Sequence, residues 1–182
     1  MITISSLKDI PQITKPIALS IGIFDGVHLG HQYLIQELKK HGTSVVLTFS
    51  NHPSEVLQPH NACSMICSLA ERLNLLEQYG VDIALVFSFT SDIANTPYDH
   101  FLKQIHEALP FDYLILGKGA VLGKNGEGTE AAVKALSKKL NFEVLYLPKF
   151  VLDGEIVSSR KIRQLLADDN SIQVARLLGR VT

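Results

Sequence analysis

Short apolar runs and longer amphipathic stretches alternate along most of the 182 residues. Apolar runs that end at glycine, proline or polar residues predict buried strands, and apolar residues recurring at spacings of three and four predict helices. The strands expected on this basis are 17–21, 44–49, 83–87, 113–116 and 142–147. The expected helices are 30–40, 69–79, 98–109 and 130–139. Pro97 is expected at the first position of the third helix, with Thr96 as its cap.

The regular alternation of buried strand and helix predicts the fold class. It is typical of an α/β protein in which helices cover both faces of a parallel sheet. In such sheets ligands bind beyond the carboxyl ends of the strands, near the point where the strand order reverses. Candidate chemistry should therefore lie directly after the apolar runs.

The residues after the first strand carry the most distinctive chemistry in the chain. Residues 22–31 read Gly-Ile-Phe-Asp-Gly-Val-His-Leu-Gly-His and lead from the strand into a helix. A helix N-terminus presents free N–H groups and the positive end of its dipole, so it suits an anion. Gly30 leaves room for a phosphate to approach the backbone. His28 and His31 are three residues apart, so both can reach that anion, and the stretch predicts a phosphate-binding site.

Composition excludes several classes of function. The formal net charge is −1 and no Lys/Arg run stands out, which disfavours a nucleic-acid partner. No apolar segment is long enough to span a bilayer, and the N-terminus lacks the basic and apolar regions of a signal peptide, so we expect a cytoplasmic protein. Cys63 and Cys67 lack a second pair of ligands for a zinc site.

The pattern Gly22-x-Phe24-Asp25-Gly26-x-His28-x-Gly30-His31 resembles the signature of the HxGH nucleotidyltransferases. It is particularly similar to the adenylyltransferase module of the prokaryotic FAD synthetases, which are bifunctional riboflavin kinase/FMN adenylyltransferases. The resemblance implies a Rossmann-like nucleotidyltransferase fold. It implies that the phosphate of FMN attacks the α-phosphate of ATP to give FAD and pyrophosphate. Mg²⁺ would come with ATP, since no carboxylate cluster indicates a metal site built by the protein.

The segment 156–166 contains a second phosphate-binding candidate. Ser158 or Ser159 can cap a helix, and Arg160 and Arg163 fall three apart on it. By themselves these residues fit either a polyphosphate clamp or an ordinary capped helix with solvated arginines. The segment resembles the Ile-Ser-Ser-Thr-x-Ile-Arg motif of the nucleotidyltransferases, with Val157 and Arg160 in place of isoleucine and threonine.

The resemblance implies specific site residues. They lie at two cationic helix N-termini, and both N-termini are expected to bind the same triphosphate. The implied catalytic residues are His28 and His31, on the α- and β-phosphates, and Arg163, on the leaving pyrophosphate. The implied ATP-binding residues are Gly22, Phe24, Asp25, Gly30, Ser158, Ser159 and Arg160.

The end of the second strand supplies the flavin-binding candidates. Residues 48–53, Thr-Phe-Ser-Asn-His-Pro, are similar to the Thr-Phe-x-Pro-His-Pro segment of FAD synthetases. The implied flavin-binding residues are Phe49, Asn51, His52 and Pro53, with Asn51 standing where the family has proline. Taken alone, the segment reads as a strand end followed by a loop.

The glycine-rich segment 117–129 is not a P-loop, because neither Lys118 nor Lys124 is followed by Ser or Thr. By its composition it could be a flexible surface loop. FAD synthetases carry Gly-x-Asp/Asn-Phe-x-Phe-Gly at this place, and Gly119, Ala120 and Leu122 depart from that pattern. These departures bear on affinity and on the identity of the substrate.

Residues 177–180, Leu-Leu-Gly-Arg, resemble the point at which family members pass into a β-barrel riboflavin kinase domain. We therefore expect a single adenylyltransferase domain over 1–182, with a core at about 15–167 and a C-terminal helical segment at 168–182, and no kinase domain in this chain. The expected partners are the small-molecule substrates ATP and FMN, with no nucleic acid or membrane, and the oligomeric state stays open.

Two alternative functions remain at this stage. The same motifs serve other small-molecule adenylyl- and cytidylyltransferases, such as those acting on nicotinamide mononucleotide, phosphopantetheine or glycerol phosphate. The changes in the glycine-rich segment also fit a flavin- or nucleotide-binding module without turnover. Formation of FAD and pyrophosphate from Mg-ATP and FMN distinguishes all three.

Overall fold

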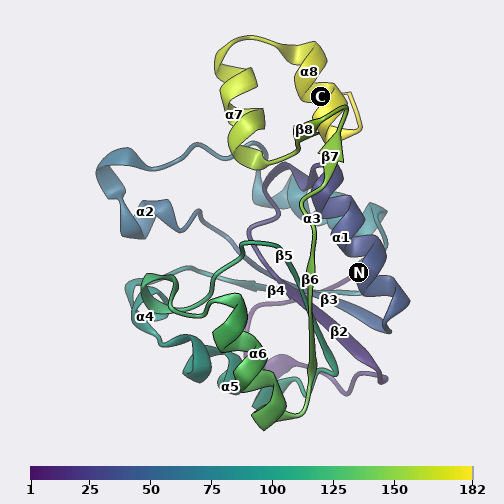
Figure 1. Ribbon diagram of the computed structural model, residues 1–182, viewed down its shortest axis with the longest axis vertical. Coiled ribbons are helices and arrows are strands. Elements are labelled where there is room, and N and C mark those ends of the chain that lie inside the picture. Colours follow the sequence, from purple (N-terminus) through teal and green to yellow (C-terminus); the bar gives the residue numbers. More distant parts are fainter. Residues whose placement is uncertain (182) are drawn as a thin grey trace.

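A computed structural model describes residues 1–181 as a parallel sheet with helices on both faces (Figure 1). All five expected strands and all four expected helices are present, with ends shifted by at most one residue. The sheet strands are β1 (Ile2–Ile4), β2 (Ile17–Ile21), β3 (Thr43–Phe49), β4 (Ile83–Phe87), β5 (Tyr113–Gly117) and β6 (Glu143–Leu147). The helices are α1 (Leu29–Lys40), α2 (Ser54–Leu57), α3 (Leu69–Gln78), α4 (Ser91–Asn95), α5 (Tyr98–Ala108), α6 (Glu130–Leu140), α7 (Ser159–Ala167) and α8 (Ser171–Leu178).

The strand order is β1-β4-β3-β2-β5-β6, and every pair in the sheet is parallel. From β2 the chain builds outward through β3 and β4, and then returns to add β5 and β6 on the other side of β2. The order therefore reverses between β2 and β5, whose register pairs Leu19 with Leu114. A ligand crevice is expected at the carboxyl ends of these two strands.

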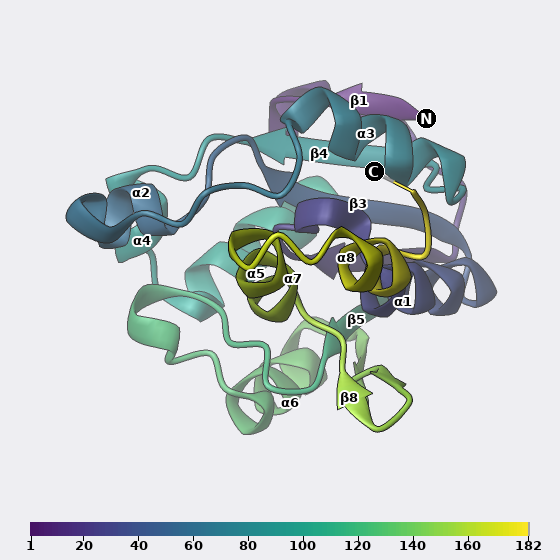
Figure 2. The same ribbon diagram turned by 90° about the horizontal axis from the view of Figure 1, so that it is seen from above.

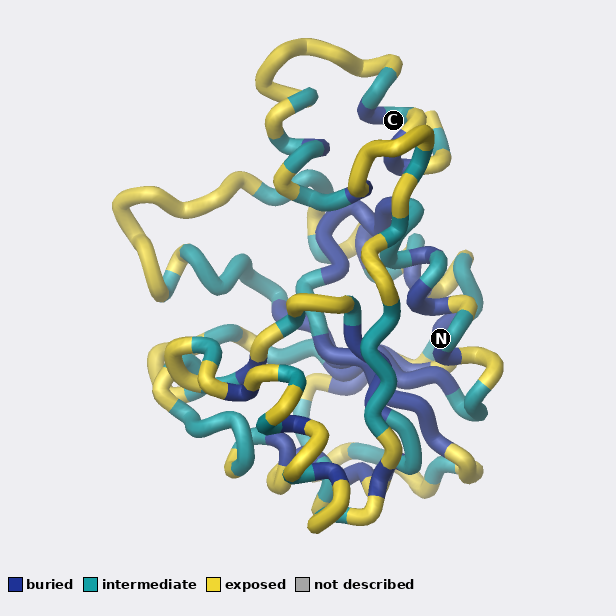
Figure 3. Tube along the Cα trace, viewed as in Figure 1, coloured by how far each residue is buried: buried dark blue, intermediate teal, exposed yellow. Residues whose placement is uncertain are grey.

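Two apolar layers cover the sheet. On one face, strand residues pack with Leu102 and Ile105 of α5 and Val133 of α6. On the other face, they pack with Ile35 of α1 and Leu76 of α3. The central strands β2, β3, β4 and β5 are buried along most of their length, whereas the arm that carries α2 is largely exposed (Figure 3). These layers confirm the predicted Rossmann-like α/β fold.

The chain beyond β6 forms a smaller unit over the carboxyl edge of the sheet. An antiparallel hairpin, β7 (Val151–Leu152) and β8 (Glu155–Ile156), leads into α7 and α8. Val157, Ile162 and Leu177 give this unit its own apolar core. Seen from above, α7 and α8 lie side by side over the strands (Figure 2). The N-terminus of α7 reaches the turn before α1, where Ser159 donates its hydroxyl to the carbonyl of Asp25 at 3.1 Å.

The structure adds elements that the apolar pattern did not predict. They are β1, α2, α4, the β7–β8 hairpin and four single 3-10 turns, η1 (Leu7–Asp9), η2 (Asp25–Val27), η3 (Pro59–Asn61) and η4 (Lys124–Gly126). The expected cap of α5 is wrong. Thr96 is the C-cap of α4, and Pro97 takes the N-cap position of α5, because the two helices follow each other without a spacer.

The longest helix in the described part of the chain, α1, has 12 residues. None of the helices within residues 1–181 is both long enough and apolar enough to cross a membrane.

Candidate functional site

The turn between β2 and α1 has an unusual backbone. Phe24, Gly26 and Val27 have φ angles of 54°, 74° and 38°, in the left-handed region. A residue other than glycine held there costs about 1–3 kcal/mol, so surrounding contacts must stabilise the turn. A Cβ atom at Gly26 would lie only 2.9 Å from Cγ2 of Ile66, so this position also has no room for a side chain.

One side chain from the following helix and one from the C-terminal segment hold this turn. Gln32 is buried and donates from Nε2 to the carbonyl of Val27 at 2.9 Å and to that of Leu178 at 2.8 Å. Arg180 donates from Nη2 to the carbonyl of Gly26 at 2.8 Å. The C-terminal segment therefore supports the residues immediately before His28. Sequence reasoning missed both groups, because the contacts of Gln32 with Leu178 and of Arg180 with Gly26 join backbone carbonyls to side chains about 150 residues away.

His28 and His31 stand together at the N-terminus of α1. His28 caps the helix, since its Nδ1 accepts the N–H of His31 at 3.3 Å. The two rings are stacked, with centroids 3.7 Å apart and planes 14° apart. Because Nδ1 of His28 accepts, its proton is on Nε2 in the neutral ring, which leaves Nε2 as a donor. Nδ1 of His31 is buried and has no partner within residues 1–181.

Burial decides the charge of both rings. His28 is 6% exposed, and burial lowers its pKa to about 4. Burial, followed by the charge of its neighbours His28 and Arg72, lowers the pKa of His31 well below the usual value. At neutral pH the two imidazoles are therefore uncharged. These rings therefore add hydrogen-bond donors, and not positive charge, to the helix N-terminus.

A cavity of about 310 Å³ opens beside these histidines, at the carboxyl ends of β2, β5 and β6. The cavity is lined at the N-terminus of α1 by His28, Gly30 and His31. It is lined at the N-terminus of α7 by Val157 and Ser158. Both predicted helix N-termini thus open into one space. The remaining lining residues are Ser20, Ile21, Gly22, Phe24, Tyr33, Leu34, Gly117, Lys118, Leu147, Pro148, Lys149, Phe150 and Ile156.

Two lysines in this lining were not identified as site residues from the sequence. Lys118 follows β5 directly, and Lys149 lies two residues after the end of β6. Their place after buried strands was the available signal, because carboxyl ends of parallel strands meet at one edge of a sheet. They give the cavity positive charge, while no Asp or Glu of residues 1–181 lines it.

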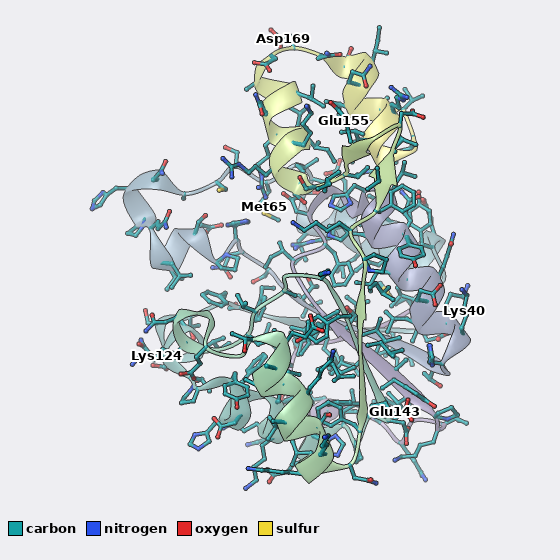
Figure 4. The ribbon with its side chains drawn as sticks, in the orientation of Figure 1. Lys40, Met65, Lys124, Glu143, Glu155 and Asp169 are labelled. Carbon is teal, nitrogen blue, oxygen red and sulfur yellow. The ribbon has the colours of Figure 1, made fainter. Side chains whose placement is uncertain are left out.

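Asp25 lies outside the cavity lining and binds the guanidinium of Arg163. Its carboxylate is 1% exposed and accepts Nη2 of Arg163 at 2.8 Å. It also accepts the backbone N–H of Ile66 at 2.9 Å, and Arg163 donates from Nε to the carbonyl of Ser64 at 2.9 Å. The loop that carries Met65 accordingly lies against the lower end of α7 (Figure 4).

The two arginines of the second motif therefore lie outside the cavity lining. Arg163 reaches the turn of His28 but is held there by Asp25, since a buried carboxylate needs a partner. Arg160 is exposed. Ser158 caps α7 by accepting the N–H of Lys161 at 3.3 Å, and Ser159 donates its hydroxyl to the carbonyl of Asp25 at 3.1 Å. Of the predicted phosphate-binding residues in this motif, only Ser158 faces the cavity.

The flavin-binding candidates lie at the end of β3, outside the same lining. Phe49 is 6% exposed and packs edge-to-face on Phe89, with centroids 5.2 Å apart. Asn51 accepts the N–H of Phe89 at 2.8 Å and donates to its carbonyl at 3.1 Å. His52 binds the hydroxyl of Ser54 at 2.7 Å, and Pro53 is the N-cap of α2.

The glycine-rich segment is folded against α5. Leu122 is buried and pairs with Gly128, and a Cβ atom at Gly128 would lie 2.6 Å from Cβ of Tyr98. A Cβ atom at Gly123 would lie 2.3 Å from the backbone nitrogen of Tyr98. Close packing on Tyr98 therefore explains two of the glycines, and the segment is not a freely exposed loop. Gly117 and Lys118, at its start, reach the cavity.

Comparison with known proteins gives a consistent family assignment. The model of the family described as FAD synthetase matches residues 10–161. A bifunctional riboflavin kinase/FMN adenylyltransferase of Haemophilus influenzae is 32% identical over 97% of this chain and 59% of its own length. The protein of the same name from Escherichia coli K12 is 30% identical over 97% of this chain and 58% of its own length. The chain thus spans about three fifths of these curated relatives.

Solved structures share the fold. A crystal structure of a macrolide-efflux protein from Streptococcus pneumoniae has a TM-score of 0.86 at 27% identity, over 98% of this chain and 61% of that chain. A pantoate-beta-alanine ligase from Francisella tularensis has a TM-score of 0.60 at 16% identity, over 97% and 86% of the two chains, and indicates a common fold alone.

Proposed function

The chain belongs to the FAD synthetase family, and we propose that it carries the FMN adenylyltransferase reaction of that family, transferring AMP from ATP to FMN to give FAD and pyrophosphate. The observation that carries this proposal is the single cavity into which the N-termini of α1 and α7 both open. Two helix N-termini aimed at one space suit a chain of phosphates, because each contributes free N–H groups and a positive dipole end.

The reaction needs alignment and charge stabilisation more than a strong base. The phosphate oxygen of FMN is already anionic, and it forms a bond to the α-phosphorus of ATP while the bond from that phosphorus to the pyrophosphate oxygen breaks. In the proposal, Nε2 of His28 and the ring of His31 donate to the phosphates. Gly30 keeps the ring of His28 uncrowded, since a Cβ atom there would lie 3.2 Å from it. Gly22 and Phe24 form the floor beneath the nucleotide.

Positive charge in the proposed site comes from lysines and arginines. Lys118 and Lys149 line the cavity and would meet the triphosphate directly. Arg160 and Arg163 remain candidates for the pyrophosphate, and Arg163 would have to exchange Asp25 for that group. Ser158 offers a hydroxyl and Ser159 lies beside it at the mouth of α7. Phe49, Asn51, His52 and Pro53 remain the proposed flavin contacts, on the neighbouring strand β3.

Mg²⁺ fits this site as part of the ATP substrate. Among residues 1–181, no group of three His, Cys, Asp or Glu side chains is placed to hold a metal ion. Mg²⁺ prefers phosphate oxygens and water, so ATP itself would supply its ligands. The proposal also covers a cytoplasmic location, where ATP is available. It includes a single adenylyltransferase domain over 1–182 with its core at about 15–167 and a C-terminal helical segment at 168–182, of which Thr182 lies outside the described residues.

The direct test is to mix the protein with Mg-ATP and FMN and to measure FAD and pyrophosphate by chromatography. Equal amounts of both products support the proposal. Binding of both substrates without product would indicate a binding module, and turnover only with another phosphate acceptor, such as nicotinamide mononucleotide, would indicate a related transferase. The altered positions Gly119, Ala120 and Leu122 make these two outcomes worth testing.

Two helix N-caps can be compared to test whether the N-terminus of α7 binds the triphosphate. Ser158 and Thr129 both accept an N–H at the start of a helix, but only Ser158 lines the cavity. Ser158→Ala should raise the KM for ATP, whereas Thr129→Ala should leave it unchanged. Equal KM values in the two variants would argue against triphosphate binding at α7.

A further inference from the structure

Arg72, on α3, is a buried cation directly beneath the turn of the site. It is 0% exposed. Its Nη1 donates to the carbonyl of Ile23 at 2.6 Å and contacts the hydroxyl of Thr48 at 3.3 Å. Its Nε and Nη2 have no hydrogen-bond partner within residues 1–181, and in that part of the chain it forms no ion pair with a carboxylate.

These contacts do not explain why a charge is buried here. The carbonyl of Ile23 already accepts the hydroxyl of Thr48 at 2.9 Å, so it does not depend on Arg72. A buried charge without an opposite charge is costly, and a well-packed apolar side chain of similar volume is often at least as stable. The positive charge therefore needs an explanation other than the stability of the fold.

The groups around Arg72 leave its charge uncompensated. Four titratable groups lie close enough to interact electrostatically with Arg72: Asp25, His31, His52 and Cys67. Asp25 is already paired with Arg163. Burial keeps His31 neutral, and burial raises the pKa of the Cys67 thiol. The interior beneath the turn is therefore net positive.

We propose, on the basis of the function proposed above, that Arg72 is a positioning residue for adenylyl transfer. Its guanidinium is a second donor to the carbonyl of Ile23, beside the hydroxyl of Thr48, and carries the charge next to the floor formed by Gly22 and Phe24. Its charge acts through the turn on the phosphates above His31 without touching them. A fixed positive charge in a water-poor interior stabilises negative charge that develops nearby more strongly than the same charge would in water. Through Thr48 it also connects the nucleotide turn to the end of β3, where the flavin candidates begin.

The proposal is tested with Arg72→Met and Arg72→Lys. Arg176→Met is the matched control, because Arg176 is an exposed arginine on α8 that pairs with Asp153 at the surface. For each protein we would measure the urea midpoint of unfolding, the affinity for Mg-ATP, and the kcat and KM of FAD formation.

We expect Arg72→Met to unfold at the same or a higher urea concentration than the wild type, since it removes a buried charge. Its kcat should fall about tenfold, less than the 10²–10³ lost when a direct donor is removed. The KM for ATP should change little. Arg72→Lys restores the charge and should recover most of the kcat, and Arg176→Met should match the wild type.

A lower urea midpoint in Arg72→Met, with no recovery of kcat in Arg72→Lys, would show that Arg72 serves the fold and would overturn the proposal. An unchanged kcat in Arg72→Met would also overturn it. Titration of His31 by NMR in the ligand-free protein separates this inference from the proposed function. If the wild type forms no FAD, the proposed function fails, while a higher pKa of His31 in Arg72→Met still supports the charge assigned to Arg72 and an unchanged pKa refutes it.

Discussion

Lowering the pH from 7 to 4 should destabilise this protein through His28. The ring is 6% exposed, and burial lowers its pKa from 6.5 to about 4. Below pH 6.5 the unfolded chain binds a proton at this residue while the folded protein does not. The stabilisation that depends on a neutral His28 is therefore fully present above pH 6.5 and is lost as the pH falls toward 4.

The size of the effect follows from the two pKa values. One pKa unit corresponds to about 1.4 kcal/mol, so the shift of His28 corresponds to about 3 kcal/mol between pH 6.5 and pH 4. This is a large part of the stability of a typical domain. Carboxylates and other histidines also titrate in this range, so a variant is needed to isolate His28.

His28→Asn provides that comparison. Asparagine can still cap α1 by accepting the N–H of His31, but it does not titrate. We would measure the free energy of unfolding of both proteins with urea at a series of pH values from 7 to 4. The wild type should lose about 3 kcal/mol more than His28→Asn over this range. Parallel curves would refute the burial of a neutral imidazole at this position.

Two further substitutions test the remaining parts of the site. His31→Ala should lower the kcat of FAD formation by about 10²–10³-fold, a typical loss for one transition-state donor. His100→Ala, at an exposed position, should leave kcat unchanged. Near-normal turnover in His31→Ala would show that this ring takes no part in the chemistry. Asp25→Asn should lower the free energy of unfolding by about 3 kcal/mol, the low end for a broken buried ion pair because the Arg163 side chain is 23% exposed. An unchanged urea midpoint would show that this ion pair does not stabilise the turn.

The structure changes the electrostatic picture of the site. The sequence predicted two cationic helix N-termini, with His28 and His31 at the first and Arg160 and Arg163 at the second. In the folded protein the histidines are neutral, Arg163 is paired with Asp25, and the charge next to the cavity comes from Lys118 and Lys149. The buried guanidinium of Arg72 adds to it from below. The charge of this site therefore depends on the burial and the partners of each titratable group, and the residue types alone do not predict it.

The sequence by itself determined the layers of the fold and the position of the two helix mouths. Apolar periodicity fixes which face of each helix and strand is buried, so the strands 17–21 and 83–87 were predicted at their observed bounds. The spacing of His28 and His31 placed both rings at one helix N-terminus, and their position after a buried strand placed them at the carboxyl edge of the sheet.

Only the tertiary structure decided which distant groups meet. The three residues of β1 carry too little pattern to predict their pairing with β4. The contacts of Gln32 with the carbonyl of Leu178, of Arg180 with the turn, of Asp25 with Arg163, and of Arg72 with the carbonyl of Ile23 join segments far apart in the chain. A local sequence pattern indicates whether a residue is buried, but it does not indicate which residues surround it in the folded protein. The protonation of a histidine and the partner of an arginine depend on those neighbours, so both emerged only once the chain was folded.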